Sequence, residues 1–309
     1  MSLLSFEWYY FDVHDPHGLD AVLTIHTIPF NSLFSVSIVD IFIYRGGRKW
    51  LHEFIVFPRK QLQKKEVPLE IQFDARNQLI QDGDEIHATF SSDTIQLRLR
   101  FQSSLLKQPP LRFQLLPQPA NTHQFRWIVR APIGEASLTL QWNENRLHIQ
   151  GPAYHDTNSG NVNFKRAVHH WYWGKFFMPD RLLIFGEIVD QQRRRRCIAL
   201  GIRENGVEID EHPEKMKQGN RLELRTTFGA FSLIQDQQTC VDDVQFYLPS
   251  VSPGFVWWGK LLEILQFYLI KFRLSGLKRL LANARYFRYR TTWQYQNRIV
   301  KSFHEEMWL

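Results

Sequence analysis

The sequence predicts an all-β protein, and three patterns support this class. Apolar and polar residues alternate strictly along Ile95–Phe101 and again along Ala136–Trp142, as they do in half-buried strands. Similar short runs recur through most of the chain. Turn-forming sequences such as Asp82-Gly83-Asp84 and Asn143-Glu144-Asn145 separate these runs. Many short strands at this spacing favour antiparallel sandwiches or barrels over α/β units.

The expected strands are short apolar or alternating runs between such turns. In chain order they cover residues 21–28, 34–38, 51–57, 69–73, 84–90, 95–101, 111–116, 123–129, 136–142, 145–150, 168–176, 182–189, 197–204, 221–226, 229–234, 243–248 and 285–292. A chain of 309 residues, 44% of them hydrophobic, can bury a large core. Antiparallel strands over roughly 250 residues usually form two packed bodies. We therefore expect an N-terminal domain at 1–165 and a C-terminal domain at 166–309.

Residues 255–284 interrupt the β pattern. Apolar residues recur there at helical spacing, and Lys and Arg fill the gaps. Residues 1–254 are balanced, and ten Lys or Arg against one acid between 255 and 301 contribute +9. Glu305 and Glu306 then bring the formal net charge to +7. This pattern is typical of an amphipathic helical insertion that lies in a membrane interface. Alternatively it packs on the sheet with its Lys and Arg stems solvated.

Partners and location follow from the same segment. Its Trp, Leu and Phe content argues against nucleic acid as the partner. The N-terminal residues 1–8 lack a basic region followed by an apolar one, so no signal peptide is expected. We expect a cytoplasmic protein, peripheral on the inner face of the membrane through 255–284.

The stretch from 151 to 160 carries the strongest chemical signal. Gly151-Pro152 is expected to mark a sharp bend before Tyr154, His155 and Asp156. In a strand, Tyr154 and Asp156 share one face and His155 takes the other. If the shared face is a barrel interior, burial raises the pKa of Asp156, which then stays a neutral acid able to protonate an alkene or carbonyl. The alternative is that Asp156 only caps a turn before Asn158.

A second aromatic stretch follows. Trp171 and Trp173 alternate onto one face of the expected strand, with His170 and Tyr172 on the other. Indole faces stabilise a desolvated cation by roughly 2 kcal/mol or more, although Trp-x-Trp on a strand also suits a plain core. The spacing of the histidines and of the two cysteines matches no metal site, and no phosphate or dinucleotide motif occurs. We expect neither a metal nor a cofactor.

Four motifs resemble those of one known family. They are, in chain order, Phe6-Glu7-Trp8-Tyr9-Tyr10-Phe11-Asp12, Tyr154-His155-Asp156-Thr157-Asn158-Ser159-Gly160, Trp171-Tyr172-Trp173-Gly174-Lys175 and Arg285-Tyr286-Phe287-Arg288-Tyr289. They are similar to landmarks of the carotenoid 1,2-hydratase (hydroxyneurosporene synthase)-like, lipocalin-like superfamily, which also includes lipocalin-like Diels–Alderases and cyclases. The resemblance implies two consecutive lipocalin-like antiparallel β-barrels with a ligand cavity near their junction.

The resemblance also implies roles for residues. In the hydratases a Tyr-x-Asp pair carries the proton chemistry, and it maps onto Tyr154 and Asp156. The sequence departs from the family pattern at Ala153 and Ser159, where the family has Gly and Trp. The hydratases' His-x-Trp pair is also incomplete, because Trp127 is present without its histidine. These departures leave cyclisation and a pericyclic reaction open beside hydration.

The combined hypothesis is a cofactor-independent enzyme acting on an isoprenoid or polyene-type apolar substrate. Asp156 is expected to be the general acid that initiates hydration or cyclisation, with Tyr154 orienting it or relaying its proton. Five further side chains are expected to bind substrate: Trp171, Trp173, Trp127, His155 and His170. The alternatives are a Diels–Alderase-like pericyclase of a natural-product pathway and a non-catalytic lipid carrier of the same fold.

Overall fold

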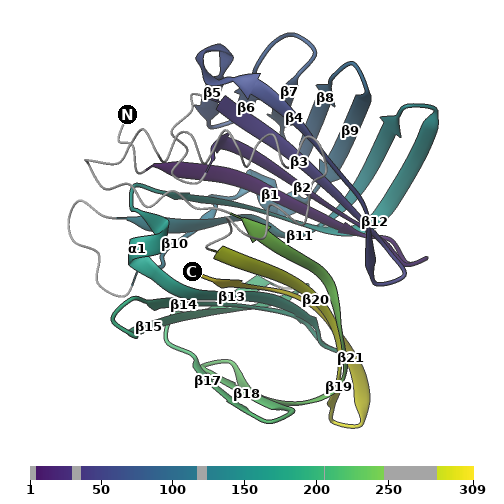
Figure 1. Cartoon of the computed structure of the whole chain (residues 1–309). Coiled ribbons are helices and arrows are strands. Elements are labelled where there is room, and N and C mark those ends of the chain that lie inside the picture. Colours follow the sequence, from purple (N-terminus) through teal and green to yellow (C-terminus); the bar gives the residue numbers. More distant parts are fainter. Residues whose placement is uncertain (1–4, 30–35, 117–123, 205, 247–283) are drawn as a thin grey trace. The chain divides into compact units, whose positions relative to one another are not determined.

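The computed structural model describes residues 5–29, 36–116, 124–204, 206–246 and 284–309. The chain divides into two compact units (Figure 1). The first comprises Met1–Gln114 and Thr122–Val162, and the second comprises Leu115–Asn121 and Asn163–Leu309. The all-β prediction is confirmed, because each unit is built on one antiparallel sheet.

The sheet of the first unit has 12 strands among the described residues. They are β1 (Phe6–His14), β2 (Leu19–Ile28), β3 (Val36–Arg45), β4 (Arg48–Pro58), β5 (Gln63–Glu66), β6 (Leu69–Gln72), β7 (Gln78–Asp82), β8 (Glu85–Ser91), β9 (Ile95–Gln102), β10 (Leu111–Gln114), β11 (Phe125–Trp142) and β12 (Asn145–Gly160). Their order is β4-β3-β2-β1-β12-β11-β9-β8-β7-β6-β5, with β10 paired to β11. The first and last strands of the unit therefore pair in the middle of the sheet.

The sheet of the second unit has nine strands among the described residues. They are β13 (Val168–Phe177), β14 (Leu182–Asp190), β15 (Arg195–Arg203), β16 (Gly206–Asp210), β17 (Glu214–Gln218), β18 (Arg221–Thr226), β19 (Gly229–Phe246), β20 (Ala284–Tyr295) and β21 (Arg298–Trp308). Their order is β16-β15-β14-β13-β21-β20-β19-β18-β17. Here too the first and last strands of the unit, β13 and β21, are neighbours.

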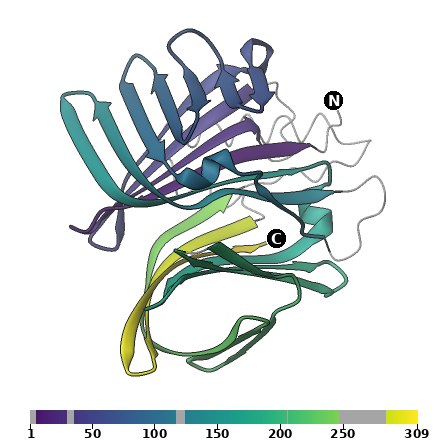
Figure 2. The same ribbon diagram turned by 180° about the vertical axis from the view of Figure 1, so that it is seen from behind.

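Each sheet curls around its own apolar core (Figure 2). In the first unit Tyr9, Phe11 and Val13 of β1 point inward, as their period of two requires. In the second unit Tyr172 and Phe176 of β13 do the same. The outermost strands of each sheet do not pair with one another among the described residues, so each sheet is a curled half-barrel and not a closed barrel.

The expected bend at Gly151-Pro152 is wrong. Both residues lie inside the continuous strand β12, and the predicted strands at 123–129 and 136–142 are likewise one strand, β11. Gly151 serves a close approach and not a turn, since a Cβ there would lie 2.3 Å from the His14 carbonyl oxygen. Pro152 lies past Val13, the last β1 residue paired with β12, so its missing N–H removes no bond to β1.

The predicted helical insertion at 255–284 lies outside the described residues, except for Ala284, which begins β20. The helices that are described are short: α1 (Phe164–Ala167) and the 3-10 turns Arg59–Gln61 and Ser104–Lys107. Among the described residues, no helix has the length and hydropathy that a membrane span requires.

Candidate active site

Strand β12 places alternate side chains of the motif on one face of the first sheet. Tyr154, Asp156 and Asn158 share that face and are almost completely buried, with exposed fractions of 0%, 4% and 3%. Strand β12 lies between β1 and β11. The register pairs Tyr10 of β1 with Asp156 and Trp127 of β11 with Asn158. Three strands thus bring these five side chains together.

Among the described residues, three side chains donate hydrogen bonds to the carboxyl group of Asp156. The Tyr154 hydroxyl donates to Oδ2 at 2.7 Å, and Nε1 of Trp127 donates to the same oxygen at 2.8 Å. Nδ2 of Asn158 donates to Oδ1 at 3.0 Å. Hydrogen bonds to an ionised acceptor are roughly twice as strong as those between neutral groups. The three donors therefore fix the orientation of the carboxyl group and stabilise its anionic form.

Further aromatic rings pack against the two aromatic donors, Tyr154 and Trp127. The Tyr10 ring meets the Tyr154 ring edge to face at 6.1 Å, and the Phe113 ring lies 5.5 Å from Trp127. Burial raises the pKa of Tyr154 well above its ordinary value, and the negative charge of Asp156 raises it further. The phenol therefore stays protonated and remains a donor to Asp156.

His155 lies on the opposite face of the same strand, as its position in the alternation predicts. It stacks on Phe11 at 3.9 Å inside the first unit's core, and its Nδ1 donates to the Tyr10 carbonyl oxygen at 2.9 Å. Burial and the charge of Arg130 lower its pKa to about 3, so the ring is neutral. His155 is therefore not part of the cluster around Asp156. It also follows that the Tyr154–Asp156 face is not the one that packs on this core.

Three of the predicted binding residues, Trp171, Trp173 and His170, belong to the second unit. Trp171 and Trp173 lie on one face of β13, and His170 lies on the other face, in a cavity inside that unit. Trp173 is buried, and the Lys175 ammonium lies 5.9 Å from the centre of its ring. Of the predicted residues, the structure thus brings together Tyr154, Asp156 and Trp127 within one unit.

Two members of the cluster were missed from the sequence. Asn158 continues the alternation that joins Tyr154 to Asp156, so the spacing alone could have identified it. Tyr10 could not be found in this way, because its place depends on the pairing of β1 with β12.

The arrangement is suited to proton transfer at one carboxyl group. A neutral Asp156 can give its proton to a substrate atom, and the three donors then stabilise the carboxylate that is left. Among the described residues, no group of three or more His, Cys, Asp or Glu side chains is placed to hold a metal ion.

Comparison with known proteins places the chain in a family. Residues 59–295 match the sequence profile described as carotenoid hydratase CrtC. No curated protein sequence matches the chain.

Solved structures share the fold at low sequence identity. CghA is 10% identical, with a TM-score of 0.63, over 99% of this chain and 88% of that chain. An AttH-like protein from Nitrosomonas europaea is 12% identical, with a TM-score of 0.59, over 99% and 92%. Kievitone hydratase from Nectria haematococca is 10% identical, with a TM-score of 0.50, over 98% and 88%. Likenesses at this identity establish the fold alone.

Proposed function

The chain belongs to the carotenoid hydratase CrtC family, and from this premise we propose that it is a hydro-lyase. It adds water across a carbon–carbon double bond of an apolar, isoprenoid or polyene-type substrate. Asp156 is the general acid and Tyr154 orients it. The single observation that carries this proposal is the buried Asp156 carboxyl group with three donors directed at its two oxygens.

The reaction proceeds through a carbocation. Asp156 transfers its proton to one alkene carbon, and the π electrons form the new C–H bond. The other carbon becomes a cation, which the nearby aromatic faces stabilise by roughly 2 kcal/mol when desolvated. A water oxygen then bonds to this carbon and returns a proton to the Asp156 carboxylate. The substrate gains one water, and the enzyme ends in its starting state.

Each donor around Asp156 has a role in this cycle. Tyr154 and Trp127 bind Oδ2, and they stabilise the charge that appears there when the proton leaves. Asn158 can donate through its amide nitrogen to the carboxylate and, with the amide reversed, accept through its oxygen from the neutral acid. The cluster can therefore support both protonation states of Asp156.

The decisive experiment is the Asp156→Asn variant. The purified protein is incubated with acyclic carotenoid substrates, and products are followed by mass spectrometry for a gain of 18 mass units. We expect the rate to fall about 10²- to 10⁴-fold while substrate affinity is kept, because Asn cannot donate the proton. Asp20→Asn is the matched control: Asp20 is equally buried but bonds to His14 and not to the cluster.

The products and rates also separate the alternatives. A product of unchanged mass that Asp156→Asn abolishes would indicate cyclisation started by the same acid. A modest loss in Asp156→Asn with an isomeric product would indicate a pericyclic reaction guided by shape. Binding without any product would indicate a carrier. Each of these outcomes would overturn the hydratase proposal.

We further propose that the protein is cytoplasmic and draws its substrate from the inner face of the membrane through 255–284. This part rests on the apolar and basic pattern of that segment in the sequence.

A further inference from the structure

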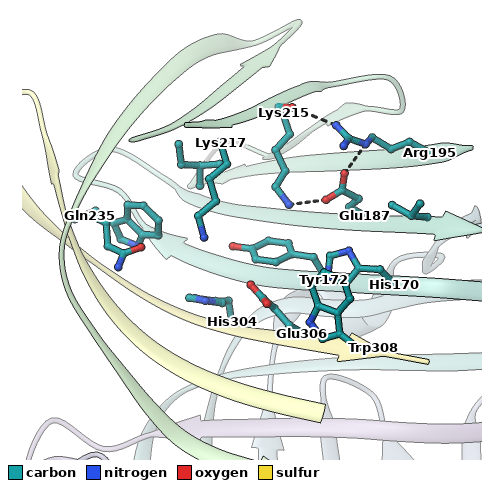
Figure 3. A pocket seen from close by; sticks show the side chains of 13 residues that line it. His170, Tyr172, Glu187, Arg195, Lys215, Lys217, Gln235, His304, Glu306 and Trp308 are labelled. Carbon is teal, nitrogen blue, oxygen red and sulfur yellow. Dashed lines mark hydrogen bonds and ion pairs between the residues drawn. The ribbon is translucent and has the colours of Figure 1, made fainter. Parts of the chain in front are cut away.

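The second unit contains a cavity of about 320 Å³, whose lining side chains come from its curled sheet (Figure 3). The apolar core of this unit includes Phe176, Leu183 and Phe231. The cavity is lined by side chains from β13 and from strands on both sides of it, among them Tyr172, Lys217, His304 and Glu306. Its volume is in the range that holds a small organic molecule.

Three of the charged side chains that line the cavity, Glu187, Lys215 and Arg195, form ion pairs with one another. The Glu187 carboxylate is almost fully buried and binds both Nζ of Lys215 and Nε of Arg195, the latter at 2.8 Å. The Lys215 ammonium also lies 3.9 Å from the centre of the Tyr172 ring. These contacts balance Glu187 and leave no need for a ligand at that wall.

Other polar groups in the cavity have no such partner. Within the part of the chain that the structure describes, Lys217 and Glu306 form no ion pair. The His304 side chain is buried, with an exposed fraction of 3%, and its Nδ1 lacks a hydrogen-bond partner among the described residues. Figure 3 shows Lys217, Glu306 and His304 directing their polar ends into the same space as the Tyr172 hydroxyl.

The balance of charge in this space is positive. Arg195, Lys215 and Lys217 face two carboxylates, those of Glu187 and Glu306. Burial, and then the charges of Lys217 and Lys215, lower the pKa of His304 to about 3. Burial and Lys215 likewise lower the pKa of His170 to about 4. Both rings are therefore neutral, and they can exchange hydrogen bonds with a ligand without adding charge.

Part of the cavity lining is apolar. Trp293 and Leu222 are buried in the wall, and the Nε1 of Trp293 is already bonded to Ser302 at 2.8 Å. At the other side the Trp308 ring stacks on His170 at 4.1 Å. Lys217 is itself exposed, and a ligand that contacts it from inside the cavity also contacts hydrocarbon and aromatic surface.

We propose that this cavity is a binding site for a small amphipathic carboxylate, separate from the Asp156 cluster. The carboxylate bonds to Lys217, with the Tyr172 hydroxyl and the His304 ring as its further partners. The hydrocarbon body packs on Trp293 and Leu222. Among the lining cations, Lys217 is the one that this anion neutralises, because Lys215 and Arg195 already bind Glu187.

The test is isothermal titration calorimetry of the full chain with three eight-carbon probes: octanoate, octanol and octylammonium. We expect octanoate to bind most tightly, with one molecule per chain. Lys217→Met keeps the aliphatic stem and removes the charge, and it should weaken octanoate binding about tenfold. Glu306→Gln removes the opposing carboxylate and should tighten it about threefold.

Two control variants test whether octanoate binds in this cavity. Lys301→Met makes the same change at an exposed position on β21 that does not line the cavity, and it should leave octanoate binding unchanged. Asp156→Asn should also leave it unchanged, which separates this site from the proposed active site. Equal binding of the three probes, tightest binding of octylammonium, or unaltered octanoate binding in Lys217→Met would each overturn the proposal.

Discussion

At the scale of single residues, the chemistry is concentrated at one carboxyl group. Asp156 is held by a phenol, an indole and an amide, each from a side chain that is itself buried. Buried donors of this kind are preorganised, since no water has to reorient when charge develops on the carboxylate. The donors should therefore matter to the rate more than to substrate binding.

A substitution at Trp127 tests whether the donors to Asp156 affect the rate more than substrate binding. Trp127→Phe keeps the ring surface and removes the N–H that donates to Asp156 at 2.8 Å. We expect kcat to fall about tenfold with KM nearly constant, because the lost bond stabilises the carboxylate formed during the reaction. Trp293→Phe is the matched control, since it removes a buried indole hydrogen bond, to Ser302, from the second unit. An equal loss of kcat in both variants would show that the effect is merely structural.

The buried His155 should make the free energy of unfolding depend on pH. Its pKa of about 3 in the folded protein lies below its ordinary value of 6.5, mainly because of burial. The unfolded chain therefore takes up a proton that the folded protein does not, so stability is complete above pH 6.5 and declines as pH falls toward 3. Each pH unit in that window costs about 1.4 kcal/mol for this residue.

The His155→Leu variant checks that sign. It should be less stable than the parent at pH 8, because it loses the bond to the Tyr10 carbonyl. By pH 5 the gap should shrink by about 2 kcal/mol, since the variant no longer takes up this proton on unfolding. Urea unfolding at the two pH values measures both gaps. A gap that is the same at pH 8 and pH 5 would contradict the prediction.

At the scale of secondary structure, the site depends on how β12 is paired. The pairing with β11 shifts register between Val129 and Ala131 and again between Ala131 and Gly134. Val129 consequently opposes Asp156, whereas Ala131 opposes His155 and belongs to the core. Such bulges re-aim side chains beside functional sites. Here the bulge lets one strand supply both the Trp127 donor and an inward-facing core residue.

The position of β12 also depends on Gly151, where the backbone of His14 comes so close that a side chain has no room. In Gly151→Ala the new Cβ would meet the His14 carbonyl oxygen at 2.3 Å, and backbone on both sides must move. We expect a loss of about 3 kcal/mol in the free energy of unfolding. Gly46→Ala in the same unit has open space around its Cβ and a φ of +57°, so it should cost only about 1 kcal/mol. Equal costs in urea unfolding would contradict the close-approach explanation.

At the scale of the whole molecule, the basic segment 255–284 leads to a prediction about membrane binding. We expect the full chain to sediment with vesicles of phosphatidylglycerol and phosphatidylcholine, and much less with phosphatidylcholine alone. Replacing Lys271, Arg273, Lys278 and Arg279 with Gln should weaken binding to the anionic vesicles at least about tenfold. Binding that is unaffected by lipid charge or by these changes would favour a helix packed on the protein.

The sequence predicted most of the strands and the faces of their side chains in both units, but not the cavity of the second unit. Alternation identified most of the strands and the faces of Tyr154, Asp156, His170 and Tyr172, because a period of two is a local property. It failed at Gly151-Pro152, where a glycine suggested a bend but in fact allows a neighbouring backbone to approach. The cavity of the second unit was not foreseen, since Lys217, His304 and Glu306 come from strands distant in the chain.

The sequence by itself determined that this is an all-β chain, that Tyr154 and Asp156 point the same way, and which family motifs it carries. Only the tertiary structure decided what those side chains face. Strand pairing is made by backbone groups that every residue has, so alternation predicts two faces but not which partners cover them. The pairing of β12 with β1 and β11 therefore had to be seen before Asp156 could be placed among Tyr10, Trp127 and Asn158.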